Sequence, residues 1–169
     1  MRFLVDSSEK KPWPAPKHRE MIRGNLQFGD YSIEGYESRV AVERKSLDDL
    51  VGSMLSMRPM GWPRFSSRLA EFARLDFACV VVEATDADIR HRKYVPDIRS
   101  TRRLGPSAEW TKRLDKLTPA EILAAVAEVI ITYRVPIYMV GPPTHAAAHG
   151  FKLLEKWHDR QKAKEAASE

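Results

Sequence analysis

The sequence predicts an α/β domain whose central sheet is covered by helices on both faces. Short apolar strands alternate along the chain with segments of helical periodicity, the pattern of such folds. Two strand candidates, FACVVVE (residues 77–83) and VPIYMV (residues 135–140), lack the alternation of a half-exposed strand. A length of 169 residues suits one core, so we expect a single domain over residues 1–164 and a polar tail at 165–169.

The first half of the chain is expected to consist mainly of strands. Residues 2–5 should form a short buried strand that ends at Asp6, before the proline-rich loop KKPWPAPKH at 10–18. Glycine and other turn-forming residues then separate several short elements. These are a helical turn over 19–23, strands over 26–28 and 31–33, and a strand over 39–45 that follows the turn EGYES.

Helices are expected where apolar residues recur at every third or fourth position. Ser46 and Asp49 have the spacing of a capping box, which begins a helix with one apolar face. Thr118 followed by Pro119 marks the start of a long helix. Further helices are expected over 64–75, near 108–114, and from 144 to about 164.

The positive charge of the chain is concentrated in one segment. The net charge is +5, and residues 90–116 alone carry +6, with nine Lys or Arg against three acids. A basic segment of this kind indicates a polyanionic partner such as a nucleic acid, and a solvated loop is the alternative.

Composition also predicts where the protein works. No apolar stretch has the length of a membrane span, and the start MRFLVDSSEKK reaches Asp6 too early for a secretory signal. The single cysteine, Cys79, lies in an apolar run and is expected to be a buried thiol. We therefore expect no membrane partner and a cytoplasmic, nucleoid-associated location of bacterial or phage type.

Three charged residues end the strand VAVERK (residues 40–45), where burying charge without a partner is costly. Because side chains alternate between the two faces of a strand, Glu43 and Lys45 should share one face. Arg44 should point to the other face. The strand therefore presents an acid and an amine together at the edge of the sheet.

A hairpin through EGYES would add a second acid to this pair. It would bring Asp30 opposite Val42 or Glu43. Two carboxylates can hold Mg²⁺ or Mn²⁺, and a lysine beside them can position water during phosphodiester hydrolysis. A surface salt bridge from Glu43 to Lys45 and a simple Gly-Asp turn are the structural alternative.

The segment GDYSIEGYESRVAVERKSLDDL (residues 29–50) resembles the G-D and V-E-R-K-x-x-x-D signature of the XPF/Hef family of structure-specific DNA endonucleases. Similarity to other family elements extends over most of the chain. It covers FLVDSSE (residues 3–9), Arg64 with Phe65 for the G-R-L element, VVVE (residues 80–83), and the final strand and helix at 134–157, a segment associated with dimerisation.

The resemblance implies a restriction-endonuclease-like core with a central mixed sheet and Mg²⁺- or Mn²⁺-dependent hydrolysis of branched DNA, in DNA repair or recombination. It implies that Asp30 and Glu43 hold the metal and that Lys45 positions water or stabilises charge. A homodimer through residues 119–134 and 144–157 is also implied. The other site residues that it suggests are Arg44, Asp6 and Asp49 in supporting roles, and Arg64, Arg68, Arg102 and Arg103 as contacts to DNA phosphates.

Three departures from the family pattern leave alternatives open. Ser8 stands where the family has the arginine of V-D-x-R-E, Arg68 stands where a glutamine follows G-R-L, and the 169 residues contain no helix-hairpin-helix module. The basic segment 90–116 could replace that module in DNA binding. The alternatives are a catalytically silent DNA-binding or dimerisation subunit, and a junction resolvase or restriction-type nuclease. A zinc pair of His145 and His149 lacks a third ligand in the sequence.

Overall fold

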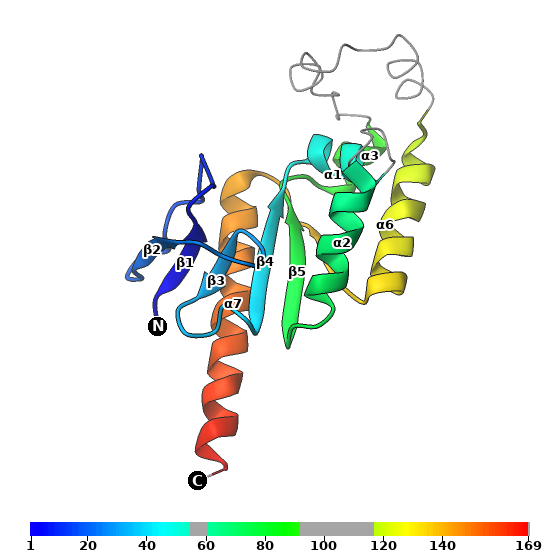
Figure 1. Cartoon of the computed structure of the whole chain (residues 1–169). Coiled ribbons are helices and arrows are strands. Elements are labelled where there is room, and N and C mark those ends of the chain that lie inside the picture. The colour runs from blue at the N-terminus through cyan, green and yellow to red at the C-terminus, as the bar shows by residue number, and fades with distance from the viewer. Residues whose placement is uncertain (55–60, 92–116, 169) are drawn as a thin grey trace.

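A computed structural model describes residues 1–54, 61–91 and 117–168. Its centre is a six-stranded mixed sheet with the strand order β2-β1-β3-β4-β5-β6 (Figure 1). Strand β3 runs antiparallel to both of its neighbours, and the pairs β1–β2, β4–β5 and β5–β6 are parallel. The strands are β1 (Phe3–Asp6), β2 (Met21–Gly24), β3 (Tyr31–Ile33), β4 (Val40–Lys45), β5 (Phe77–Val82) and β6 (Ile137–Met139).

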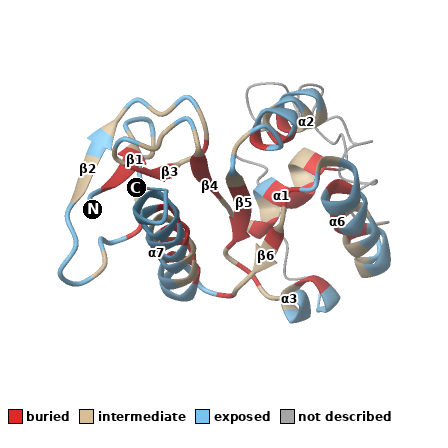
Figure 2. Ribbon diagram, turned by 90° about the horizontal axis from the view of Figure 1, so that it is seen from below, coloured by how far each residue is buried: buried red, intermediate tan, exposed pale blue. Residues whose placement is uncertain are grey.

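Helices cover both faces of the sheet, as expected (Figure 2). The helices are α1 (Leu47–Met54), α2 (Gly61–Phe72), α3 (Asp86–Arg90), α6 (Pro119–Tyr133) and α7 (Pro143–Ala166). Helix α7 packs on one face, and α1, α2 and α6 pack on the other.

Neighbouring residues of the central strands bury opposite faces, which explains their unbroken apolar runs. In β4, Ala41 packs into the core under α1, α2 and α6, and Val42 packs into the core under α7. In β5, Val80 and Val81 divide in the same way, and all four side chains are fully buried. A strand that is covered on both faces favours apolar residues at successive positions, because each face is buried.

Two local predictions for the first half of the chain were wrong. Residues 21–24 form the edge strand β2 rather than a helical turn, because parallel pairing with β1 and the packing of Met21 on the core outweigh local preference. Residues 26–28 form no strand. The backbone N–H of Leu26 donates to the Asp6 carboxylate at 2.8 Å, so the segment is held by a side chain.

The helix starts agree with the sequence prediction at two positions and differ at a third. Thr118 forms a capping box with Glu121 at the start of α6, and Ser46 bonds with Asp49 at the start of α1. Helix α2 begins at Gly61 rather than at residue 64, since Pro63 is tolerated in a first turn. The helix expected near 108–114 lies outside the described residues.

The apolar side of α7 lies on the sheet, whereas that of α6 packs with α1 and α3 in the core on the other face. Helix α6 also has apolar residues on its outer side. Phe151, Leu154 and Trp157 of α7 are buried against the strands. Helix α6 leaves Ile130 at 37% and Ile131 at 74% exposure. Helix α7 ends at Ala166, two residues into the expected tail. None of the helices in the described ranges combines the length and the apolar character needed to cross a membrane.

Candidate active site

The antiparallel pairing of β3 with β4 brings Asp30 to the charged end of β4. Tyr31 pairs with Val42, and the N–H of Asp30 donates to the Val42 carbonyl at 2.9 Å. The backbone N–H of Arg44 in turn donates to Asp30 Oδ2 at 2.8 Å. The main chain of β4 therefore fixes the Asp30 carboxylate beside Glu43, in the arrangement that the hairpin predicted.

Gly29 makes this close approach possible. It has a φ of +67°, and a Cβ at this position would lie 2.9 Å from the carbonyl oxygen of Val42, the acceptor for Asp30. Gly35, in the turn of the same hairpin, also has a positive φ of +81°, but a Cβ there would meet nothing within 4 Å. Gly29 thus carries both a conformational and a steric requirement, whereas Gly35 carries only the first.

We expect Gly29→Ala to be much more damaging than Gly35→Ala. The left-handed conformation costs about 1–2 kcal/mol for alanine in both variants, and the overpacking against Val42 adds about 1–3 kcal/mol at Gly29 alone. Urea unfolding measures the difference. Equal losses for the two variants would show that the contact with Val42 places no constraint on the hairpin.

Glu43 is the most deeply buried acid of the site and faces two cations. Its residue is 6% exposed. Arg68 Nη1 of α2 donates to Glu43 Oε2 at 2.8 Å, and Lys45 Nζ lies 3.9 Å from Glu43 Oε1. The Lys45 ammonium also sits over the ring of Phe65, 4.8 Å from its centroid, which keeps it on this face of the sheet.

The charge of Glu43 acts on its neighbours in the site. Burial, and then the negative charge of Glu43, raise the pKa of Asp30 to about 7. The charge of Glu43 also raises the pKa of Arg68, so this guanidinium stays protonated. An acid pair of this kind is a feature of functional sites, because a cation or a proton must offset its charge.

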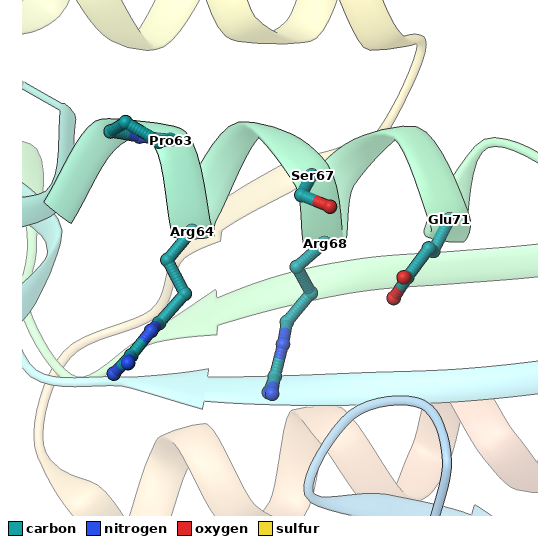
Figure 3. A pocket seen from close by; sticks show the side chains of 5 residues that line it. All are labelled: Pro63, Arg64, Ser67, Arg68 and Glu71. Atoms are coloured by element: carbon teal, nitrogen blue, oxygen red, sulfur yellow. The ribbon is translucent and has the colours of Figure 1, made fainter. Parts of the chain in front are cut away.

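Helix α2 presents two arginine side chains beside the acids. Arg64 and Arg68 extend from the same side of this helix, as Figure 3 shows. A cavity of about 370 Å³ lies against them and is lined by Pro63, Arg64, Ser67, Arg68 and Glu71. The two other basic residues predicted to contact phosphate, Arg102 and Arg103, lie outside the described residues.

The Arg44 side chain is on the opposite face of the sheet from Lys45, as strand alternation predicted. Its Nε and Nη2 atoms donate to the two carboxylate oxygens of Glu83, at 2.7 and 3.1 Å, and Nη1 lies 3.3 Å from Glu9 Oε1. Glu83 also accepts a bond of 2.8 Å from Trp13 Nε1. Arg44 is thus held by side chains and contributes to the site through its main-chain N–H.

Asp6 and Asp49 have structural partners of their own. Asp6 accepts hydrogen bonds from the N–H of Leu26, and from the N–H and the hydroxyl of Ser8. Burial acts to raise the pKa of Asp6, but the bonds from Ser8 and Leu26 outweigh it and lower the pKa. Asp49 is exposed and bonded to Ser46 at the start of α1. Ser8, where the family has arginine, therefore anchors the loop after β1.

The described residues fit a magnesium site that has few protein ligands. No group of three or more His, Cys, Asp or Glu side chains is arranged to hold a metal within residues 1–54, 61–91 and 117–168. Mg²⁺ needs only one or two carboxylates, because it keeps water ligands and takes oxygens from substrate phosphates. Burial and then the charge of Glu43 raise the pKa of Asp30, and a cation bound to both acids would offset their charge.

Sequence reasoning missed two contacts of this site. Trp13 comes from the proline-rich loop, and its only signal was a large aromatic residue between two prolines. The pair of Arg68 with Glu43 joins residues that are 25 positions apart, and no local pattern indicates it. Among the described residues, His145 and His149 have no third side chain placed to complete a metal site, and the ring of His149 packs against Tyr138, 4.9 Å between centroids.

The mixed sheet with helices on both faces defines an α/β domain consistent with a restriction-endonuclease-like core. The sequence matches the ERCC4 domain over residues 6–153, and the chain belongs to this domain family. The resemblance to XPF-type nuclease domains is thereby confirmed. A comparison with curated proteins gives no match.

Solved structures of XPF share the fold. XPF from Aeropyrum pernix is 20% identical, with a TM-score of 0.59, and the match covers 92% of this chain and 60% of that one. XPF from Aeropyrum pernix in complex with DNA is 19% identical, with a TM-score of 0.58, and the match covers 94% of this chain and 66% of that one. The chain thus spans about 60–66% of the length of these XPF chains.

Proposed function

We propose that this chain is the catalytic domain of a Mg²⁺- or Mn²⁺-dependent endonuclease that hydrolyses phosphodiester bonds in branched DNA. The observation that carries the proposal is the convergence of Asp30, Glu43 and Lys45 at one end of the sheet. Asp30 directly precedes β3, Glu43 lies in the neighbouring antiparallel strand β4, and the amine of Lys45 lies on the same face as Glu43. This set provides oxygen ligands for a hard cation and a positive group for the reacting phosphate.

Asp30 and Glu43 would hold the metal. When bound, Mg²⁺ or Mn²⁺ supplies positive charge that polarises the phosphoryl group and favours ionisation of water. The N–H of Arg44 holds Asp30 Oδ2, which leaves Oδ1 of this carboxylate as the oxygen to offer. Lys45 would orient the attacking water or stabilise the charge that develops on phosphorus. Asp6 and Asp49 would support the loop after β1 and the start of α1.

DNA binding would rely on the phosphate backbone. Arg64 and Arg68 line a cavity next to the acids, and the segment 90–116, with Arg102 and Arg103, carries +6. Contacts to phosphate and to the shape of the DNA favour a branched or distorted structure over a base sequence. The fold shared with an XPF that was solved with DNA supports this choice of substrate.

Assembly and cellular role follow from the same proposal. A homodimer through residues 119–134 and 144–157 is supported mainly by α6, where Ile130 and Ile131 are exposed. The apolar residues of α7 are used in the core, so its contribution would come from its outer side. A nuclease for branched DNA would act in DNA repair or recombination, in a cytoplasm where it meets the nucleoid.

A substrate panel tests the proposal. Flaps, forks, four-way junctions and plain duplex are incubated with the protein and Mg²⁺, Mn²⁺ or EDTA. We expect nicking of forked or flapped DNA that depends on the cation and is lost in Glu43→Gln, with DNA binding retained. Preferred cleavage of junctions or of plain duplex would indicate a resolvase or a restriction-type enzyme instead.

A catalytically silent subunit is the second candidate, and Ser8 in place of the family arginine is the observation that favours it. Such a subunit would bind branched DNA firmly and nick none of the substrates with any divalent cation. The presence of Asp30, Glu43 and Lys45 in one cluster argues for the active enzyme.

A further inference from the structure

The side chain of Arg68 and a metal cation would use the same carboxylate. Arg68 Nη1 donates to Glu43 Oε2 at 2.8 Å, a distance typical of a charge-assisted hydrogen bond. The Glu43 side chain is 8% exposed, whereas that of Arg68 is 43% exposed. The acid is therefore fixed in place, and the guanidinium is the partner that can move.

The charges of the site balance when Arg68 is included. Asp30 and Glu43 are offset by Lys45 and Arg68, so these four groups sum to zero when both acids are ionised. A divalent cation on the same acids brings the sum to +2. Its repulsion of a guanidinium on Glu43 favours the release of Arg68 from this carboxylate.

An alternative position for the Arg68 side chain exists on the same helix. The cavity of about 370 Å³ is lined by Arg64, Ser67 and Arg68, and Figure 3 shows the two guanidinium groups extending from one side of α2. Two arginines and a hydroxyl one helical turn apart can share a phosphate group. Glu71 also lines this cavity, so a released Arg68 would lie between this carboxylate and a phosphate of bound DNA.

We propose that Arg68 is an exchangeable counter-ion, which neutralises Glu43 in competition with the metal and passes to a DNA phosphate when the metal binds. The inference rests on the proposed function, because it needs a metal at Asp30 and Glu43. It makes Arg68 a positioning residue that links cation binding to DNA binding. The glutamine expected after a G-R-L element could not act in this way, since it carries no charge.

Calorimetric titration with Mn²⁺ alone, without DNA, tests the first half of the proposal. Removing the competing hydrogen bond in Arg68→Gln should tighten Mn²⁺ binding by about 3- to 10-fold. Arg64→Gln removes the same charge one turn away, and its Mn²⁺ affinity should stay within about twofold of the wild type. Arg68→Lys keeps the charge but not the forked geometry and should lie between them.

Fluorescence anisotropy of a labelled fork at several salt concentrations tests the second half. In Ca²⁺, Arg68→Gln should reduce the slope of log affinity against log salt by about 0.9, the value for one lost phosphate contact. In EDTA its slope should equal that of the wild type, because Arg68 is then held by Glu43. Arg64→Gln should reduce the slope in both conditions.

The two proposals can fail separately. Suppose that the wild type nicks branched DNA, that Arg68→Gln does not gain Mn²⁺ affinity, and that its salt slope in Ca²⁺ does not differ from that in EDTA. The counter-ion role is then wrong, and the proposed nuclease function is unaffected. If Arg64→Gln gained the same Mn²⁺ affinity, the gain would come from the loss of any nearby positive charge. This result would also contradict the counter-ion role of Arg68. If neither the wild type nor Arg68→Gln binds Mn²⁺, both proposals are wrong.

Discussion

Asp30→Asn is expected to abolish strand cleavage and at the same time to raise the melting temperature of the protein in EDTA. The loss of cleavage, roughly 10³-fold, follows from the removal of a charged ligand for the cation. The gain in stability follows from burial and from Glu43, which raise the pKa of Asp30 to about 7. Asparagine keeps an oxygen for the N–H of Arg44 and carries no charge.

The pH dependence of stability gives the sign of this effect. The folded pKa of about 7 lies above the ordinary value of 3.8, so the folded state binds the proton more tightly than the unfolded state. Ionisation of Asp30 therefore lowers the free energy of unfolding as the pH rises from about 4 through 7. Above pH 7 we expect Asp30→Asn to be more stable than the wild type by roughly 1–3 kcal/mol, measured by urea unfolding in EDTA.

Asp6→Asn is the matched control, because it should have the opposite effect. Hydrogen bonds from Ser8 and Leu26 lower the pKa of Asp6 despite the opposing effect of burial, so its ionised form stabilises the fold. We expect this variant to unfold at a lower urea concentration than the wild type at pH 8. A loss of stability in Asp30→Asn similar to that in Asp6→Asn would contradict the view that Asp30 is held at a cost to the fold.

Trp13→Ala is expected to have the largest effect on stability. The side chain is 2% exposed, stacks on Tyr31 with 4.5 Å between centroids, and meets Phe151 edge-on at 5.9 Å. A Cβ on Gly150 would lie 2.7 Å from Trp13 Cζ3, so helix α7 packs closely against this ring. Removing it should cost about 3–5 kcal/mol, measured by urea unfolding.

Trp13→Phe separates the packing of this ring from its hydrogen bond. Phenylalanine keeps an aromatic ring against Tyr31 but cannot donate to Glu83, which also holds Arg44. We expect a smaller loss of about 1 kcal/mol for the bond, plus the cost of a smaller ring, and a lower cleavage rate with an unchanged Mn²⁺ affinity. Equal stability of the alanine and phenylalanine variants would show that the ring contributes little to the core.

The sequence predicted those parts of the fold whose signals are local. Thr118 with Pro119 predicted the start of α6, and Ser46 with Asp49 predicted the start of α1. The uninterrupted apolar run of β5 predicted a strand that is covered on both faces. The strand β2 was missed because its conformation depends on pairing with β1 rather than on its own residues. Pro63 obscured the start of α2, since proline ends most helices but is accepted in a first turn.

The positions of the strand side chains in the candidate site were also predictable from local patterns. Strand alternation placed Glu43 and Lys45 on one face, and the hairpin placed Asp30 beside them. The partners from elsewhere in the chain were not predictable, because Arg68 reaches Glu43 of β4 from helix α2 and Trp13 reaches Glu83 across 70 positions. Local patterns specify which groups a strand presents, and the tertiary fold decides what they contact.

The position of a bound cation would show whether Asp30 and Glu43 hold the metal. A crystal of the wild-type protein soaked in Mn²⁺ should show an anomalous peak between Asp30 and Glu43, within coordination distance of one oxygen of each carboxylate. The same soak of Asp30→Asn should show a much weaker peak. A wild-type crystal with no peak between these two carboxylates, or with Mn²⁺ bound only elsewhere, would show that Asp30 and Glu43 are not the metal ligands.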